Sequence, residues 1–360
     1  MSAITNTMAA VPVTARMGSK GTAARARAIA ARKTNALRFE RRSTKVQTKP
    51  FSVVSAQATV ETEFDFNEYM KAKAVITEKA LDESVAQQYP DSVHESMRYS
   101  LLAGGKRIRP ALCIAACEMF TEDSSVAMPT ACALEMIHTM SLMHDDLPCM
   151  DNDDFRRGKP TNHKVYGEQC AILAGDGLLT RAFEYIAMAT PLDKVDPKVV
   201  LRVVAYVAKC VGSEGLVGGQ IVDIEMEGAH EEATLETLQY IHAHKTAALL
   251  DAAVVSGALL GGATEEDVER LTRYSQNIGL AFQVIDDILD CTQTSEQLGK
   301  TAGKDDAVGK TTYPSLLGLE ESKRIGLKLI EDAKAELSVY DPQRAAPLIA
   351  LADYIGSRQN

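Results

Sequence analysis

Apolar residues recur every three or four positions through most of the chain beyond residue 57, which is the spacing of one face of an α-helix. Alternating runs typical of strands are scarce. Glycine pairs at 104–105 and 261–262 mark helix ends, Pro129 marks a helix start, and Thr264 with Asp267 resembles a capping box. The sequence therefore predicts an all-α protein of about ten or more helices, with helical segments at 69–89, 93–102, 111–120, 128–144, 167–187, 235–260 and 265–289.

The first 50 residues differ from the rest in charge. They hold 11 of the 39 Lys and Arg residues but one of the 49 acids, Glu40, with much Ala, Ser and Thr and no apolar stretch of signal-peptide type. This composition is typical of an organelle transit peptide, with a disordered basic tail as the alternative. We predict a disordered, cleaved transit peptide at 1–56 and one helical domain at 57–360. Without its leader the chain is strongly acidic, so we expect no nucleic-acid partner.

Two further absences narrow the class of protein. No run of about 18 apolar residues free of charge appears, so we expect no transmembrane segment. The seven cysteines have no spacing typical of zinc sites or disulfide frameworks, so we expect reduced thiols. Cys113 and Cys117 lie one helical turn apart and are interpreted as core residues.

Aspartates gather at two places within or beside helical runs. They are Asp145, Asp146 and Asp151 in the first cluster and Asp286, Asp287 and Asp290 in the second. Pro148 interrupts the first helix, so Asp151 comes from the following turn. In the second, Asp286 and Asp290 share a helix face, with Gln283 one turn earlier. Carboxylates beside apolar residues need a cation, and oxygen ligands favour Mg²⁺, which completes its shell with water and substrate phosphate. The clusters predict a diphosphate held between metal ions.

Two basic clusters flank the first aspartate cluster. Lys106, Arg107 and Arg109 follow a glycine pair, and Arg156-Arg157 precede Gly158. Each cluster taken alone has an ordinary alternative as a solvated face or a set of surface ion pairs. In so acidic a chain, arginine forks beside glycines indicate phosphate recognition instead.

Together these motifs resemble the trans-prenyltransferases of the polyprenyl synthetase family, specifically the plant and algal plastid geranylgeranyl diphosphate synthases. The resemblance runs from about residue 66 to the C-terminus. Residues 145–158 resemble the family's first aspartate-rich motif in its longer form, and 286–290 the second. Residues 104–110 resemble the isopentenyl diphosphate site, while 299–305 and 309–311 resemble a basic loop.

The resemblance implies an isoprenoid synthase bundle around a central prenyl tunnel, with all six aspartates catalytic. It puts three Mg²⁺ ions, or Mn²⁺ as a substitute, on Asp145, Asp151, Asp286 and Asp290. The residues implied for the allylic diphosphate are Arg156, Lys245, Thr246, Gln283, Lys300 and Lys310. Those implied for isopentenyl diphosphate are Lys106, Arg109, His138 and Arg157.

The chemistry implied is ionisation of an allylic diphosphate, attack by the isopentenyl double bond and loss of a proton. The allylic substrates would be dimethylallyl, geranyl and farnesyl diphosphate. Met140 and Ser141 occupy positions where farnesyl-producing relatives often carry aromatic rings, so we expect a twenty-carbon product. His144 beside Asp145 is interpreted as a helix-end residue, since Mg²⁺ prefers oxygen ligands. The segment from Gly218-Gly219-Gln220 to Asp223 resembles a cavity-lining segment of the family and is given a helix-packing role with a polar contact.

Three other functions remain as alternatives. A non-catalytic regulatory subunit of the same fold generally lacks aspartates that are present here, and a class I terpene cyclase has a different second metal motif. A farnesyl diphosphate synthase would share the chemistry. We expect a homodimer, with a small regulatory subunit or downstream prenyl-consuming enzymes as further partners. The expected location is the plastid stroma rather than the mitochondrion.

Overall fold

The computed structural model describes residues 64–226, 234–292 and 311–358. The predicted transit peptide therefore lies outside the described residues. The chain divides into Met1–Val60 and Glu61–Asn360, and every element below belongs to the second unit. Its α-helices are α1 (Phe66–Ser84), α2 (Asp91–Leu101), α3 (Ile108–Glu118), α4 (Met128–Asp145), α5 (Asn162–Tyr166), α6 (Glu168–Ala189), α7 (Pro197–Val211), α8 (Leu216–Met226), α9 (Leu235–Ile241), α10 (Ala248–Gly261), α11 (Glu265–Thr292), α14 (Tyr313–Leu317), α15 (Leu319–Glu336) and α16 (Pro342–Ser357).

Four short elements complete the described fold. A 3₁₀ turn, η1 (Ser124–Ala127), precedes α4, and a π-helical turn, η2 (His242–Ala247), joins α9 to α10. The strands β1 (Phe155–Arg156) and β2 (Lys159–Pro160) form one antiparallel hairpin. The all-α prediction is confirmed, whereas the hairpin and the π-helical turn were not predicted.

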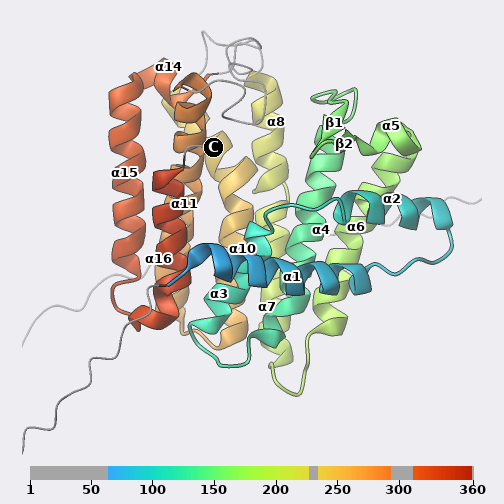
Figure 1. The fold of residues 1–360 in the computed structure, drawn as a ribbon, viewed down its shortest axis with the longest axis horizontal. Coiled ribbons are helices and arrows are strands. Elements are labelled where there is room, and N and C mark those ends of the chain that lie inside the picture. Colours follow the sequence, from blue (N-terminus) through green and yellow to red (C-terminus); the bar gives the residue numbers. More distant parts are fainter. Residues whose placement is uncertain (1–63, 227–233, 293–310, 359–360) are drawn as a thin grey trace, which may run out of the picture. The chain divides into compact units, whose positions relative to one another are not determined.

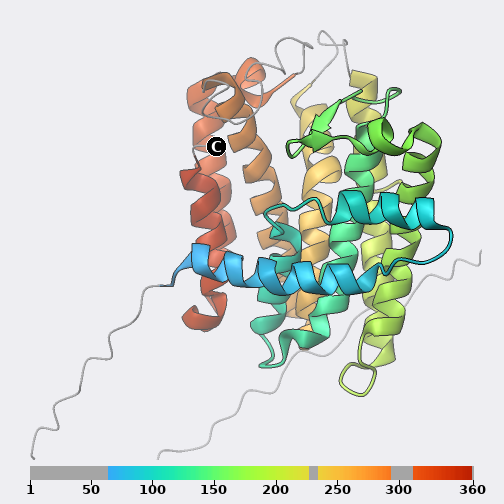
Figure 2. The ribbon, with the colours of Figure 1, turned by 45° about the vertical axis from the view of Figure 1, so that its right-hand side comes forward.

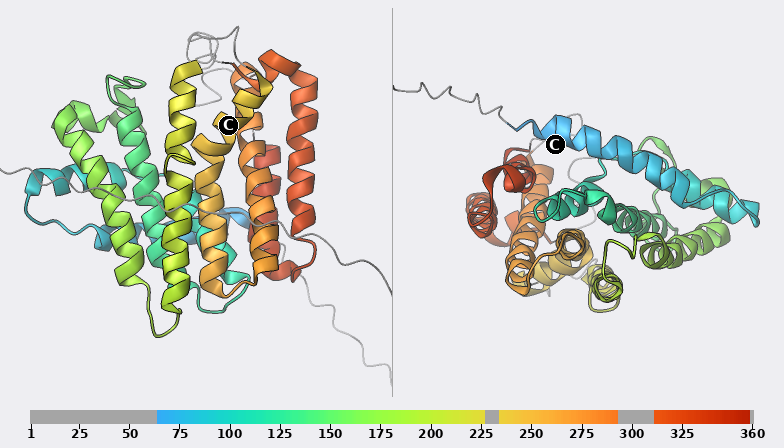
Figure 3. Two further views of the ribbon diagram at one scale, coloured as in Figure 1. Left: turned by 180° about the vertical axis from the view of Figure 1, so that it is seen from behind. Right: turned by 90° about the horizontal axis from the view of Figure 1, so that it is seen from below.

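The long helices run side by side, and α1 with α2 crosses them (Figure 1; Figure 2). Seen along the bundle, α10 lies inside, among α3, α4, α7 and α11 (Figure 3). Every residue of α10 from Leu249 to Leu260 is buried. Residues 235–261 are long and apolar enough to cross a membrane by length and composition, but 72% of the apolar window is buried inside the protein. A buried core helix can have the same length and apolar composition as a membrane-spanning helix.

Helices α3 and α10 approach closely because Gly257 carries no side chain. A Cβ atom at Gly257 would lie 2.0 Å from the carbonyl oxygen of Cys113. Cys113 and Cys117 face this contact and are fully buried, and burial raises the pKa of the Cys117 thiol to about 12. The interpretation of both thiols as core residues is confirmed, so neither is on the surface for a partner subunit.

Gly257→Ala is expected to lower the free energy of unfolding by about 2 kcal/mol, because the added methyl group must separate two packed backbones. The Tm measured by circular dichroism should fall by several degrees. Gly177→Ala is the matched control, since the nearest atom to its new Cβ is the flexible Met97 side chain and alanine favours the helix. Equal Tm values for the two variants would contradict the close contact.

Candidate active site

A cavity of about 430 Å³ lies between α4, α8 and η2, with one residue from α3. Its charged and polar lining includes residues predicted for substrate, metal and product length, namely Arg109, His138, Ser141, Asp145, Lys245 and Thr246. Its apolar wall comes largely from α8, through Leu216, Val217, Ile221 and Ile224. The cavity therefore has a polar part and an apolar wall. A prenyl diphosphate, with its charged head and apolar chain, would require both.

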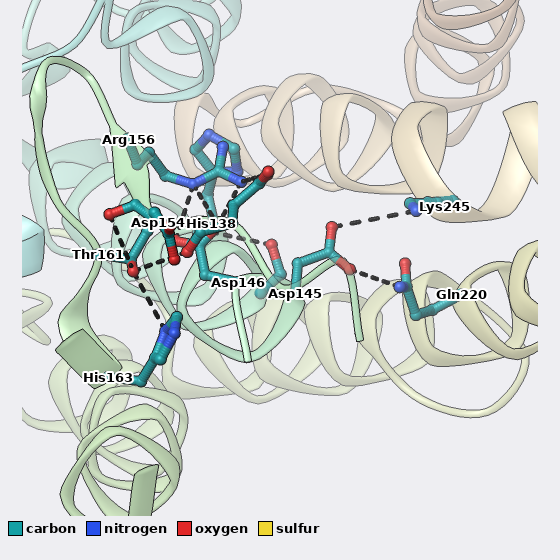
Figure 4. A network of polar contacts seen from close by, with 11 residues as sticks. His138, Asp145, Asp146, Asp154, Arg156, Thr161, His163, Gln220 and Lys245 are labelled. Atoms are coloured by element: carbon teal, nitrogen blue, oxygen red, sulfur yellow. Dashed lines mark hydrogen bonds and ion pairs between the residues drawn. The ribbon is translucent and has the colours of Figure 1, made fainter. Parts of the chain in front are cut away.

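The two aspartates at the end of α4 point in different directions (Figure 4). Asp145 Oδ1 accepts a hydrogen bond of 2.5 Å from Gln220 Nε2, and its Oδ2 lies 4.0 Å from Lys245 Nζ. Burial raises the pKa of Asp145, although Lys245 opposes this effect. Asp145 is thus the partly buried carboxylate that faces the cavity.

Asp146 instead holds Arg156. Its buried carboxylate accepts hydrogen bonds from Arg156 Nε at 2.8 Å and Nη2 at 2.5 Å. Burial raises the pKa of Asp146, and the hydrogen bonds from Arg156 oppose that rise. Asp146 does not line the cavity, so the contribution of this aspartate is to fix the arginine.

A tight turn returns Asp151 to the end of α4. Its backbone N–H donates to the Asp145 carbonyl oxygen at 2.9 Å, and its side chain is exposed. The adjacent Asn152 has a left-handed backbone, with φ of 51°. The break that Pro148 predicted is present, because α4 ends at Asp145, and it brings the third aspartate of the cluster back toward the first.

The second cluster lies near the C-terminal end of α11. Asp286 accepts a hydrogen bond of 3.2 Å from Arg358, whose guanidinium lies 4.3 Å from the centre of the Phe282 ring. Asp287 accepts one of 2.9 Å from the Tyr313 backbone N–H, while Asp290 is buried. Asp287 therefore also serves to anchor the start of α14. Gln283 is half-buried one turn earlier on α11.

The π-helical turn η2 links the two clusters. On one side Lys245 donates to Asp223 of α8 at 2.5 Å and approaches Asp145. On the other side His242 Nε2 lies 3.9 Å from Asp287 Oδ2. The turn packs tightly on α8, where a Cβ at Gly219 would lie 2.1 Å from the backbone nitrogen of Lys245. The predicted packing role of the Gly218-Gly219 pair is confirmed, and so is the polar contact of Gln220.

His138 and Arg109 line the same cavity, and Arg157 acts electrostatically on both. Burial, then the nearby Arg109 and Arg157, hold the pKa of His138 well below its usual value, so its imidazole is neutral. Burial also lowers the pKa of both arginines, and the buried Nε of Arg109 has no hydrogen-bond partner within the described protein. Arg157 donates to the Gly104 carbonyl oxygen. An anion placed here would relieve this crowding of positive charge.

One predicted cation among the described residues lies apart from that group. Lys106 is exposed, and its Nζ lies 3.4 Å from the Tyr354 hydroxyl at a second cavity, beside α1 and α16. Lys300 and Lys310 lie outside the described residues. Of these two residues of the 104–110 motif, Arg109 therefore lines the first cavity and Lys106 lines the second.

The two residues predicted to set product length line the cavity. Ser141 Oγ donates to the His138 carbonyl oxygen at 2.9 Å, and Met140 is buried. His144 also lines the cavity but packs on α6, with its Nε2 3.2 Å from the Ile172 carbonyl oxygen. A Cβ at Gly175 would lie 2.2 Å from that nitrogen, so the helix-end interpretation of His144 is confirmed.

His242 and Arg358 were not predicted as residues of the site. His242 lies beside Asp287, and Arg358 donates to Asp286 from the far end of the chain. Asp223, which ends the predicted segment 218–223, accepts a hydrogen bond from Lys245. Nothing near Arg358 in the sequence points to α11.

The sequence pattern of the polyprenyl synthetase family matches residues 90–341. Among similar proteins, the chloroplastic geranylgeranyl pyrophosphate synthase of Catharanthus roseus is 60% identical, over 82% of each chain. The chloroplastic heterodimeric geranylgeranyl pyrophosphate synthase large subunit 1 of Arabidopsis thaliana is 57% identical, over 82% of this chain and 80% of its own. The crystal structure of geranylgeranyl pyrophosphate synthetase from Pyrococcus horikoshii superimposes with a TM-score of 0.75 at 30% identity, covering 81% of this chain and 98% of that one. On the sequence, the fold and the motifs alike, this chain belongs to the polyprenyl synthetase family.

Proposed function

We propose that this protein is a Mg²⁺-dependent geranylgeranyl diphosphate synthase of the plastid. It condenses isopentenyl diphosphate with dimethylallyl, geranyl and farnesyl diphosphate, and so supplies precursors of carotenoids and chlorophyll. The observation that carries the proposal is η2, where Lys245 and His242 connect the two aspartate clusters beside an apolar-walled cavity. The chloroplastic relatives and the basic leader support the plastid location, with residues 1–56 as transit peptide and 57–360 as the catalytic domain.

The donor atoms fit Mg²⁺. Within the described ranges no three His, Cys, Asp or Glu side chains already form a closed metal cluster. The carboxylates of Asp145 and Asp151 on one side, and Asp286 and Asp290 on the other, supply oxygen ligands only, which suits an ion that shares its shell with substrate phosphate. Three ions remain our expectation for a full site. When bound, Mg²⁺ supplies charge stabilisation for the leaving diphosphate.

The side chains of this protein would do the rest. Arg156, fixed by Asp146, together with Lys245, Thr246, Gln283, Lys300 and Lys310, would orient the allylic diphosphate. Arg109, His138 and Arg157 would hold isopentenyl diphosphate, with Lys106 drawn in from its present place. As the allylic carbon–oxygen bond breaks, the diphosphate keeps the electron pair. The isopentenyl double bond then forms the new carbon–carbon bond, and the released diphosphate accepts the proton. The apolar wall keeps water from the cation.

Binding of the allylic substrate tests this assignment. Calorimetry of the protein with farnesyl diphosphate should give a Kd at least tenfold lower with Mg²⁺ than with EDTA, because the carboxylates repel an unaccompanied diphosphate. Equal affinity in both buffers would argue against a metal-bridged site. Mn²⁺ should substitute for Mg²⁺ in the same titration.

Ser141→Phe is expected to shorten the product. The ring would project along the cavity wall one turn before Asp145 and stop chain growth, so farnesyl diphosphate should become the main product, as identified by chromatography of the prenyl alcohols. As the control, Leu201→Phe changes an exposed surface site and should leave product length unchanged. An unaltered twenty-carbon product from Ser141→Phe would reject the assignment.

We also infer a homodimer. One face of α6 packs into the core, and the other exposes Ile172, Leu173 and Met188 to solvent, which is costly for an isolated subunit. A second copy is the simplest cover for this face, with a small regulatory subunit or a prenyl-consuming enzyme as alternatives. Sedimentation of the purified protein would distinguish a dimer from a monomer.

A further inference from the structure

Arg107 lies between two residues predicted to bind substrate, yet its side chain points the other way. The side chain is completely buried, and the backbone is left-handed, with φ of 48°. Such a backbone is unfavourable for arginine and persists only where contacts hold it in place. Arg107 immediately precedes α3, which carries Arg109.

Three elements accept hydrogen bonds from the Arg107 guanidinium. Its Nε donates to Glu78 of α1 at 2.7 Å, and its Nη1 donates to Glu135 of α4 at 2.5 Å. Its Nη2 donates to the carbonyl oxygen of Leu101, at the end of α2, at 2.7 Å. The planar fork is therefore committed to the protein, and Arg107 has little left for a substrate.

Glu135 extends this contact toward the reacting groups. It is 2% exposed and lies three residues before His138 on α4, the helix that ends at Asp145. Because three residues bring side chains to the same face, His138 lies about one turn along from it. The negative charge of Glu135 also acts on Arg109 and Arg157, opposing the fall in the pKa of each.

We propose that Arg107 and Glu135 form a positioning pair that fixes the isopentenyl diphosphate half of the site relative to α4. This inference rests on the proposed function. The pair ties the segment carrying Lys106 and Arg109 to the helix carrying His138 and Asp145. Bond formation between two bound substrates requires their reacting carbons to lie about 3–3.5 Å apart in the correct orientation, and a 1 Å misplacement can cost about 10²-fold in rate.

Arg107→Lys and Glu135→Gln test the pair. Arg107→Lys keeps the charge but loses the fork, and Glu135→Gln keeps the shape but loses the charge. Each should weaken isopentenyl diphosphate binding by calorimetry at least tenfold and lower kcat, while the Kd for farnesyl diphosphate with Mg²⁺ stays within twofold. Asp251→Asn is the matched control, since Asp251 is a buried carboxylate bonded to Tyr206 and Ser275 away from the cavity; it should lower Tm without changing the ratio of the two Kd values.

The double variant Arg107→Met with Glu135→Gln guards against simple unfolding. Removing both charges avoids leaving one buried and unpaired, so its Tm should exceed that of Arg107→Met alone, while weak isopentenyl diphosphate binding persists. Equal changes in both affinities, or normal isopentenyl diphosphate binding in the folded variants, would overturn the inference. If the wild-type protein bound both substrates but did not condense them, the proposed function would be rejected. The role of the pair would still be decided by the ratio of the Kd values for isopentenyl and farnesyl diphosphate.

Discussion

Asp145→Asn should lower kcat/KM by about 10³-fold, equivalent to about 4 kcal/mol of transition-state stabilisation. Asp145 is the carboxylate of the first cluster that faces the cavity, within reach of Gln220 and Lys245. The neutral amide removes charge from the proposed metal site while nearly preserving volume. Steady-state kinetics with farnesyl and isopentenyl diphosphates, at saturating Mg²⁺, measures the loss.

The same substitution should not weaken the metal-free fold. Burial raises the pKa of Asp145 above its unfolded value, so at neutral pH the ionised carboxylate disfavours the folded state, and this cost disappears as pH falls below the unfolded pKa. The metal-free Tm of Asp145→Asn should equal or exceed that of the wild type. Asp193→Asn, at an exposed loop position, should leave both kinetics and Tm unchanged. A fully active Asp145→Asn protein would remove Asp145 from the metal site.

Lys245→Gln is expected to lower kcat about 10²-fold, the usual effect of removing one donor from charge that develops in a transition state. Lys245 Nζ lies 4.0 Å from the Asp145 carboxylate and also donates to Asp223. Without it, the diphosphate loses a positive partner, and Asp223 is left without that donor. Single-turnover measurements would separate this loss of chemistry from a change in product release.

Lys323→Gln provides the comparison for Lys245→Gln. Lys323 is an exposed lysine on α15 with an ion pair to Glu320, so its loss should change neither kcat nor Tm appreciably. If Lys245→Gln behaved like Lys323→Gln, η2 would have no part in catalysis. A rise in KM for farnesyl diphosphate with unchanged kcat would limit Lys245 to ground-state binding.

Local signals predicted some helix boundaries, whereas α1 ends at Ser84 instead of residue 89, and α7, α8, α15 and α16 had no predicted range. The capping box at Thr264 and Asp267 is present, with the Thr264 N–H donating to Asp267 at 2.9 Å. Gly262 adopts the left-handed backbone expected after a helix. The predicted segment 235–260 instead contains a π-helical turn between α9 and α10. An apolar pattern does not reveal a single π-helical turn, because such turns are short, rare and have no residue signature of their own.

Within the site, composition predicted which motifs matter but not where each side chain points. Asp146 faces Arg156, and Asp287 faces the Tyr313 backbone, although both are adjacent to aspartates that remain proposed metal ligands. Arg107 points inward while Lys106 and Arg109 diverge to separate cavities. These directions depend on a left-handed residue, a tight turn and distant partners, none of which has a periodic signature in the sequence.

The most direct measurement is product formation by the domain spanning residues 57–360. The protein would be incubated with isopentenyl diphosphate and each of dimethylallyl, geranyl and farnesyl diphosphate, with Mg²⁺ or with EDTA, and the prenyl alcohols identified after dephosphorylation. We expect a twenty-carbon alcohol from every primer with Mg²⁺ and none with EDTA. No condensation under any of these conditions would contradict the proposed synthase and favour a non-catalytic subunit of the same fold.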